Sequence, residues 1–210
     1  MTGRAFIVGD IHGCYDQLVA AMRRAGFDRS SDRLYAVGDL IDRGPRSLDV
    51  LQLLCEPWFF SVKGNHEVML EANYLGHDTS GMHASFGGEW FDALPADQRE
   101  ACFELVRDLP VTMTVTTPSG RRIGIVHADL CGSNWDAFVE MLGTHQLAED
   151  VAMWSRSRIR NLQGYPNDIA GVDLVIMGHT INPEPVQAGN CRWIDTGCYR
   201  TGVLTLEELV

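Results

Sequence analysis

The sequence predicts an α/β fold in which a parallel sheet in the N-terminal half is followed by a second, more antiparallel sheet. Short apolar runs recur along the first half, and stretches with helical spacing of apolar residues lie between them. The apolar runs also end in glycine-rich blocks that carry acidic or imidazole side chains. Since open α/β sheets bind ligands at the carboxyl ends of their strands, we expect these blocks to line one edge of a sheet.

The first half of the chain alternates strands and helices. Strands are predicted over residues 5–8, 33–37 and 58–62, and the spacing of apolar residues predicts helices over residues 15–26 and 48–54. Two consecutive βαβ crossovers imply a parallel sheet with helices packed over it.

Residues 73–108 differ in character, because several glycines and Pro95 interrupt short helical stretches. We expect a helical excursion that covers or flanks the functional site. No linker or internal repeat is visible, and 210 residues lie near the upper range of one domain. The prediction is a single domain over residues 1–210.

The second half turns to β-structure. Residues 110–117 alternate apolar and polar side chains, Pro118-Ser119-Gly120 predicts a hairpin turn, and residues 122–126 return as a strand. The further predicted elements are a mostly helical stretch, a buried strand and two closing strands, over residues 135–153, 172–177, 191–195 and 202–207.

Composition excludes several classes of protein. The net charge of −11 argues against a nucleic-acid-binding surface, since phosphate backbones are held by clustered Lys and Arg. The six cysteines form no CxxC pair, so we expect buried or free thiols and no structural zinc. No signal segment or apolar membrane span is present, which favours a cytoplasmic protein without a membrane partner. The sequence predicts no oligomeric state.

Three blocks in the first third of the chain pair glycines with potential metal ligands. They are Gly9-Asp10-Ile11-His12-Gly13, Gly38-Asp39-Leu40-Ile41-Asp42-Arg43-Gly44 and Gly64-Asn65-His66-Glu67. Later, His127 and His179 each follow a predicted strand. Side chains of these types bind hard or borderline divalent cations. Together they make a set of six candidate ligands, namely Asp10, His12, Asp39, Asn65, His127 and His179.

Six ligands suffice for two metal ions. A dinuclear hydrolase needs a carboxylate between its ions, and Asp39 in the central block is the natural bridge. Asp10 and His12 would then hold one ion, and the other three ligands would hold the second. Two ions about 3.5–4 Å apart can generate hydroxide from water and clamp the oxygens of an in-line displacement at phosphorus. Oxygen and imidazole ligands suit manganese, iron, zinc, nickel or magnesium.

These blocks, together with His127-Ala128 and Gly178-His179, resemble those of the phosphoprotein phosphatases in the calcineurin-like metallophosphoesterase superfamily. The chain is similar in length and detail to the bacteriophage lambda type of protein-serine/threonine phosphatase. The resemblance extends from Phe6 to Asp195-Thr196-Gly197. It implies a two-sheet sandwich flanked by helices, with a dinuclear metal site at the carboxyl ends of the strands.

The resemblance also implies roles for neighbouring residues. His66 would be the general acid that protonates the leaving alkoxide, and Asp42 would fix its tautomer and favour its charged form. Arg43, Arg156 and Asn65 would bind the phosphate. The implied reaction is hydrolysis of phosphoserine and phosphothreonine in proteins or peptides by a metal-activated water, without a phosphoenzyme. Manganese is the metal that the resemblance favours.

Two other functions are compatible with parts of this pattern. Symmetrical hydrolases of diadenosine tetraphosphate share the same five blocks, but they tend to be longer. A non-catalytic module that binds phosphorylated proteins is disfavoured, because such a module should have lost a ligand or the acid. The eukaryotic relatives' recognition of regulatory subunits should not be transferred, since Asp129 stands where many of them have Gly.

For several residues, a purely structural role is an alternative to the functional role. Asp42 and Arg43 could form a surface ion pair, and Arg156 could belong with Arg158 and Arg160 to a solvated basic face. Glu67 could cap a helix or support the ligands. Structural and site-flanking roles both stay open for a further set: His77, His83, His145, Trp90, Phe91 and Tyr199.

Overall fold

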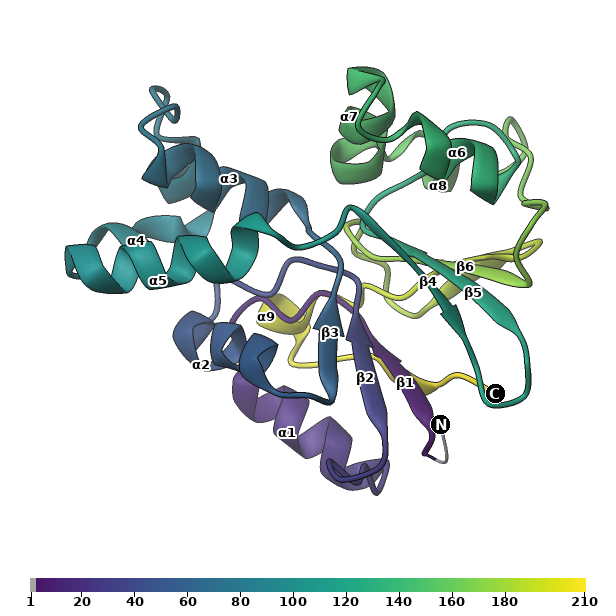
Figure 1. The fold of residues 1–210 in the computed structure, drawn as a ribbon, viewed down its shortest axis with the longest axis horizontal. Helices are drawn as coiled ribbons and strands as arrows, with labels where there is room; N and C mark the ends of the chain where they lie inside the picture. The colour runs from purple at the N-terminus through teal and green to yellow at the C-terminus, as the bar shows by residue number, and fades with distance from the viewer. Residues whose placement is uncertain (1–2) are drawn as a thin grey trace.

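The computed structural model describes residues 3–210 and contains two β-sheets between layers of helices (Figure 1). The strand order is β3-β2-β1-β9 in the first sheet and β4-β5-β6-β8-β7 in the second. The predicted two-sheet α/β architecture is therefore confirmed. The predicted domain of residues 1–210 includes Met1 and Thr2, which lie outside the described residues.

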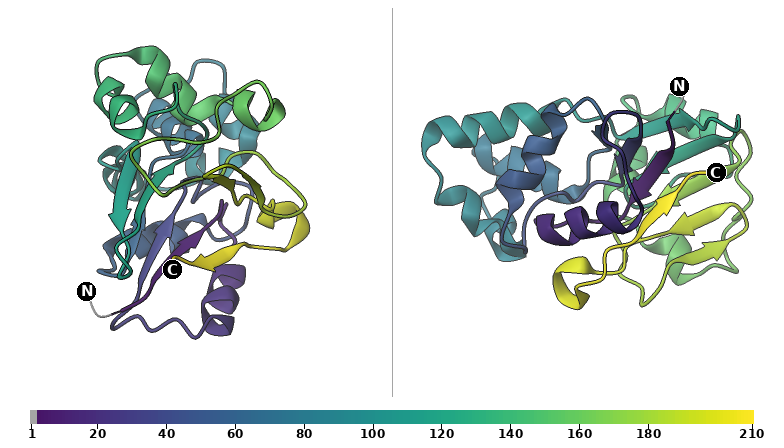
Figure 2. Two further views of the ribbon diagram at one scale, coloured as in Figure 1. Left: turned by 90° about the vertical axis from the view of Figure 1, so that its right-hand side faces the viewer. Right: turned by 90° about the horizontal axis from the view of Figure 1, so that it is seen from below.

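The first sheet contains the two predicted crossovers. Strands β1, β2 and β3 are parallel, and helices α1 and α2 connect them. Strand β9 pairs antiparallel with β1, as the two views of Figure 2 show. The bounds are β1 Ala5–Val8, α1 Tyr15–Arg24, β2 Arg33–Ala36, α2 Ser47–Gln52, a 3-10 turn Leu53–Cys55, β3 Phe59–Ser61 and β9 Leu206–Glu208.

The second sheet is the more antiparallel of the two, as predicted. The pairs β4-β5 and β7-β8 are antiparallel, whereas β5-β6 and β6-β8 are parallel. In the first sheet only the β1-β9 pair is antiparallel. The bounds are β4 Thr112–Thr116, β5 Arg122–Val126, β6 Leu174–Met177, β7 Val186–Ala188 and β8 Cys191–Trp193.

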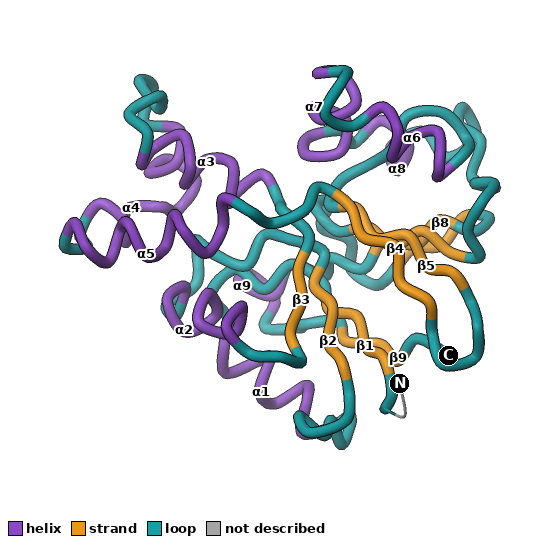
Figure 3. The backbone as a smooth tube through the Cα atoms, in the orientation of Figure 1, coloured by secondary structure: helices purple, strands orange, loops and turns teal. Residues whose placement is uncertain are grey.

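The remaining helices lie at the periphery, while the strands gather in the middle (Figure 3). The predicted excursion over residues 73–108 is helical and interrupted, as expected. Helix α3 Asn65–Tyr74 leads into it. Its elements are a π-helical turn Ala84–Gly88, α4 Glu89–Asp92 and α5 Ala96–Arg107. The helices of the C-terminal half are α6 Trp135–Met141, α7 Gln146–Trp154, α8 Ser157–Arg160 and α9 Cys198–Thr201.

Both faces of the central strands are buried, which explains their apolar sequences. In β1, Phe6 and Val8 pack in the cluster that includes residues of α1 and α2, whereas Ile7 packs against the second sheet. In β6, Ile176 belongs to the same inter-sheet cluster, and Val175 faces the α6 and α7 side.

Two predictions about the whole chain concern membranes and thiols. Among residues 3–210, every helix is too short or too polar to cross a bilayer. All six cysteines are free thiols, as expected, and four of them are buried.

Candidate functional site

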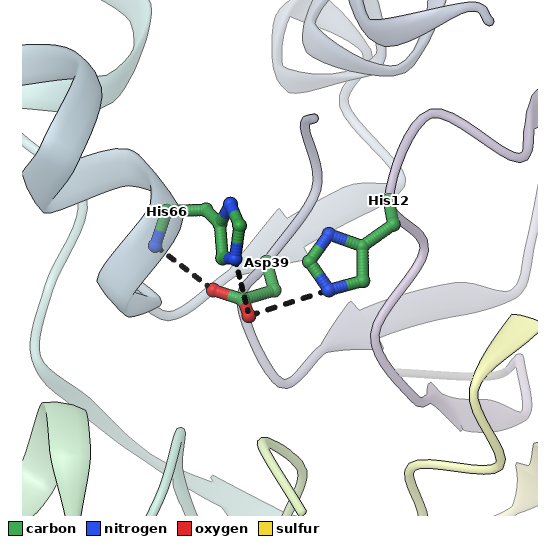
Figure 4. Close-up of side chains that lie close together, drawn as sticks. All are labelled: His12, Asp39 and His66. Atoms are coloured by element: carbon green, nitrogen blue, oxygen red, sulfur yellow. Dashed lines mark hydrogen bonds and ion pairs between the residues drawn. The ribbon is translucent and has the colours of Figure 1, made fainter. Parts of the chain in front are cut away.

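The Asp39 carboxylate lies between the imidazoles of His12 and His66 (Figure 4). Its Oδ2 atom is 3.5 Å from His12 Nε2 and 3.9 Å from His66 Nε2. Its Oδ1 atom is 3.4 Å from His127 Nε2. Asp39 is shared by two groups whose potential ligand atoms lie within 4.8 Å of one another: His12, Asp39 and His66 in one, and Asp39, His127 and His179 in the other. The structure thus brings together a carboxylate and imidazoles that could hold two metal ions.

Backbone carbonyls orient three of these imidazoles. His12 Nδ1 lies 2.8 Å from the carbonyl oxygen of Ile41, and His127 Nδ1 lies 2.8 Å from that of Val37. His179 Nε2 lies 3.2 Å from a backbone carbonyl oxygen. Since a carbonyl only accepts, each of these nitrogens donates, and the opposite ring nitrogen keeps its lone pair. Metal-binding histidines are oriented in the same way.

Burial keeps these imidazoles neutral. It lowers the pKa of His12 to about 3 and that of His179 to about 2. The pKa of the buried His127 is also lowered, mainly by desolvation. A metal ligand must be deprotonated, so the electrostatic state of the three rings suits metal binding.

The other two predicted ligands adjoin the same cluster. Asn65 Oδ1 is 3.0 Å from His127 Nε2, and both Asp10 carboxylate oxygens accept the backbone N–H of His179, at 3.0 and 3.2 Å. Burial and the charges of Asp195 and Asp39 raise the pKa of Asp10. Three buried carboxylates so close together need compensating positive charge, which divalent cations supply.

The predicted acid and its partner form a buried hydrogen-bonded pair. His66 Nδ1 lies 2.6 Å from Asp42 Oδ2, and both side chains are fully buried. Although desolvation alone would lower the pKa of His66, the charges of Asp39 and Asp42 raise it. His66 Nε2 is buried without a hydrogen-bond partner. This atom is therefore free to donate a proton to a group bound beside Asp39.

Two arginines reach the cluster, Arg43 from the loop after β2 and Arg156 from the turn between α7 and α8. Arg43 Nη1 lies 2.7 Å from His12 Nε2, and its guanidinium stacks over the Tyr199 ring at 4.6 Å. Arg156 Nη2 donates to the carbonyl oxygen of His179 at 3.4 Å. Desolvation lowers the pKa of Arg156, and nearby Arg160 and Arg43 lower it further. Both side chains are placed where they could bind a phosphate near Asp39.

The alternative of a solvated basic face is wrong for Arg158, which is 1% exposed. Arg158 Nε donates to Asp129 Oδ1 at 2.8 Å, and Asp129 Oδ2 accepts the backbone N–H of Arg158 and the hydroxyl of Ser155. This buried ion pair fixes the turn that carries Arg156. Asp129 therefore has a structural role that the sequence did not predict.

Backbone strain is concentrated at the candidate site. Among residues 3–210, five non-glycine residues have positive φ, and all five are predicted site residues: His12, Asp39, Asp42, Arg43 and His179. Their φ values range from 45° to 71°. Such conformations cost free energy and persist where surrounding contacts force them, as they often do at functional sites.

Two carboxylates near the cluster were not among the predicted site residues. Glu67 accepts the backbone N–H groups of Asp39 and Leu40, both at 2.9 Å, and also caps α3. It therefore combines the two roles that the sequence left open. Asp195 is buried, and desolvation and the charge of Asp39 raise its pKa to about 6. It lies two residues after the end of β8, as Asp10 lies two residues after the end of β1, and this position could have revealed it.

The histidines and aromatic residues with open roles divide into two groups. His77 and His145 are exposed, and Phe91 is buried in the core. His83 and Trp90 both contact Asp42, and Tyr199 packs edge-on against His12. The sequence could not distinguish these groups, because their contacts join distant segments.

Comparisons with known proteins agree with this geometry. Residues 3–183 match the family model described as calcineurin-like phosphoesterase. The chain is 39% identical to "Serine/threonine-protein phosphatase 1" of Salmonella typhimurium, over 97% of this chain and 91% of that protein.

Two further similarities involve proteins named for another substrate. The chain is 33% identical to a symmetrical bis(5'-nucleosyl)-tetraphosphatase of Aromatoleum aromaticum, over 73% of this chain and 63% of that protein. A solved structure titled as a putative diadenosine tetraphosphatase superposes with a TM-score of 0.73 at 24% identity, covering 100% of this chain and 90% of that one. The structural similarity supports the fold alone.

Proposed function

The chain belongs to the calcineurin-like phosphoesterase family, a family of hydrolases, and from this premise we propose that it is a metal-dependent protein-serine/threonine phosphatase. One observation carries the proposal. His66 Nε2 is buried and unpaired beside the carboxylate that both groups of potential ligands share. A proton donor at this place serves an ester whose leaving alkoxide must be protonated.

In this proposal His66 donates a proton from Nε2 to the leaving oxygen. Asp42 holds the Nδ1–H group at 2.6 Å and stabilises the imidazolium form until the proton is transferred. Arg43 and Arg156 bind the phosphate oxygens from two sides, and Asn65 assists them. Local positive charge at these arginines lets a protein of net charge −11 accept an anionic substrate.

The residues that would hold two divalent ions are those predicted: Asp10, His12, Asp39, Asn65, His127 and His179. Oriented neutral imidazoles and an excess of buried carboxylate support this set. We propose manganese as the metal. Bound ions would lower the pKa of a water molecule and neutralise the charge of the phosphate.

Phosphorylated proteins or peptides are the proposed substrates. The 39% identity to a protein named as a serine/threonine phosphatase, over nearly the whole of both chains, supports this choice. The second candidate is symmetrical hydrolysis of diadenosine tetraphosphate, which the name of the Aromatoleum relative favours. The alignment covers 63% of that relative, compared with 91% of the serine/threonine-phosphatase relative.

The test is a comparison of substrates with manganese-loaded protein. We expect turnover of a phosphoserine peptide and of 4-nitrophenyl phosphate, with a higher kcat/KM on the peptide than on diadenosine tetraphosphate. A preference for the dinucleotide would replace the proposed function with the second candidate. Tight binding of the phosphopeptide without release of phosphate would instead indicate the non-catalytic module.

A further inference from the structure

The two oxygens of Asp42 have different partners. Oδ2 accepts from His66 Nδ1 at 2.6 Å. Oδ1 accepts from Trp90 Nε1 at 2.7 Å and lies 3.1 Å from His83 Nε2. We infer that His83 and Trp90 are positioning residues, which hold Asp42 so that His66 presents Nε2 to the leaving group. The inference rests on the proposed role of His66 as the acid, and neither residue touches the substrate itself.

The tautomer of His83 follows from its other nitrogen. His83 Nδ1 lies 3.2 Å from Asn73 Nδ2, which is a donor only, so Nδ1 accepts. His83 Nε2 therefore carries the ring hydrogen and donates it to Asp42. Asn73 also donates to Asp92 Oδ1 at 3.0 Å, which fixes its amide in this orientation.

Burial makes these bonds strong. The side chains of Asp42, His66 and His83 are all 0% exposed. Hydrogen bonds to a buried carboxylate are charge-assisted, and a lost one is not replaced by water. Although desolvation alone would raise the pKa of Asp42, the bonds from His66 and His83 lower it. The carboxylate is thus kept ionised and fixed in orientation.

The backbone of the π-helical turn brings these donors close to Asp42. Gly87, at φ +98°, accepts the backbone N–H of Arg43 at 3.3 Å. A Cβ atom at Gly87 would lie 2.8 Å from Arg43 N, and one at Gly88 would lie 2.3 Å from the His83 ring. The π-helical turn therefore packs closely against the loop that carries Asp42 and Arg43 (the Asp42 loop). Side chains larger than hydrogen at Gly87 and Gly88 would prevent this packing.

The Asp42 loop needs such support. Asp42 and Arg43 are consecutive non-glycine residues with φ of 71° and 67°. Inside the loop, the Ser47 hydroxyl accepts the backbone N–H of Asp42 at 3.0 Å. The contacts from residues 83–90 add three external bonds to the same turn. Without them the turn can relax, and His66 loses its fixed partner.

The expected signature is a dependence on the leaving group. A well-placed acid accelerates departure of a serine alkoxide, whereas 4-nitrophenolate leaves readily without a proton. Poor placement of His66 should therefore reduce turnover of a phosphoserine peptide and spare 4-nitrophenyl phosphate. A general loss of folding or of phosphate binding would reduce both by the same factor.

The experiment compares Trp90→Phe with Trp58→Phe in the manganese-loaded protein. Trp58 is buried, and its Nε1 donates to Glu56 Oε2 at 3.1 Å, so the control also loses an indole-to-carboxylate bond. We expect Trp90→Phe to lower kcat on the phosphoserine peptide about tenfold, with less than a twofold change on 4-nitrophenyl phosphate. Trp58→Phe should leave the ratio of the two rates unchanged. Equal losses on both substrates in Trp90→Phe would overturn the inference.

His83 is tested by a pair of variants. His83→Leu removes the donor and should give the same selective loss, whereas His83→Gln can still donate to Asp42 and should restore most of the peptide turnover. Equal behaviour of the two variants would remove His83 from the positioning role. If His83→Leu does not fold, Trp90→Phe alone decides.

A spectroscopic measurement separates this inference from the proposed function. A short hydrogen bond between His66 Nδ1–H and Asp42 gives a proton resonance far downfield in NMR spectra. With diamagnetic magnesium in place of manganese, we expect the signal in the native protein and in Trp58→Phe, and its loss or upfield shift in Trp90→Phe. If the native protein hydrolyses no phosphomonoester, the proposed function fails, whereas an unaltered His66 signal in Trp90→Phe overturns the positioning role whatever the substrate.

Discussion

The loops of the first sheet and those of the second sheet contribute differently to the candidate site. The first sheet presents Asp39 and the His66–Asp42 pair on successive loops, with four of the five strained residues: His12, Asp39, Asp42 and Arg43. The second sheet presents His127, His179 and Arg156, held by backbone carbonyls and a buried ion pair. In the proposed mechanism, proton transfer would depend on the strained first-sheet loops, while the second sheet would complete the ligand set and the phosphate contacts.

Replacing Asp39, which belongs to both groups of potential ligands, should have the largest effect on turnover. Asp39→Asn keeps the size of the side chain but removes the charge that both groups of ligands share. We expect loss of both metal ions and at least a ~10⁴-fold fall in turnover, because water activation and charge neutralisation are lost together. Metal content by mass spectrometry and hydrolysis of 4-nitrophenyl phosphate measure this. Retention of two ions with full turnover would show that Asp39 does not bridge.

A ligand of the second sheet should have a smaller and uniform effect. His179→Asn removes an imidazole whose Nδ1 lies 3.1 Å from His127 Nε2. We expect weaker binding of one ion and a roughly 10³-fold loss on every leaving group, since several kcal/mol of charge stabilisation disappear. Titration with manganese and rates on alkyl and aryl phosphates measure both effects. A loss confined to alkyl phosphates would contradict the assigned ligand role.

Replacing the proposed acid, His66, should affect alkyl phosphates much more than aryl phosphates, in contrast to the uniform effect of His179→Asn. His66→Asn removes the proton donor while the other potential ligands remain, so we expect both ions to stay bound. Turnover of alkyl phosphates should fall by about 10²–10⁴-fold, and that of aryl phosphates much less. The same titration and leaving-group series apply. Loss of an ion in this variant would indicate that His66 is a metal ligand and not the general acid.

We expect the smallest effect from breaking the ion pair between Asp129 and Arg158, which supports Arg156. Asp129→Asn leaves the buried Arg158 cation without its carboxylate, which should lower stability by about 3 kcal/mol and Tm by roughly 6–12 °C. The KM for a phosphopeptide should rise, because Arg156 lies on the released turn. Asp136→Asn, in an exposed ion pair with Arg122, should leave Tm unchanged. Equal Tm shifts in both variants would show that the buried pair has no special role.

The sequence predicted periodic elements better than others, and it missed the ten-residue helix α3 as well as several short elements. The βαβαβ unit and the hairpin are present as expected, because apolar periodicity and turn residues are local signals. Strand β7 and helix α9 were not predicted, since three or four residues carry little pattern. The closing strand predicted over 202–207 is β9, which begins only at Leu206. Gly202, in the left-handed conformation, ends α9.

Site residues were likewise predicted only where a local sequence signal marks them. The predicted ligands and the His66–Asp42 pair converge in the structure because each lies in a block directly after a strand. His83 does not lie in a block directly after a strand. It stands 41 residues from Asp42 in the chain, and only the packing of the π-helical turn against the Asp42 loop brings them together.

The sequence by itself determined which side chains stand at the strand ends, and hence the family, the candidate ligands and the candidate acid. These depend on residue type and local periodicity, which a chain displays before it folds. Only the tertiary structure decided which ring nitrogen faces the cluster, that Arg158 is buried against Asp129, and that His83 and Trp90 hold Asp42. Those features require particular atoms from distant segments to lie within hydrogen-bond distance, and that distance is fixed by packing.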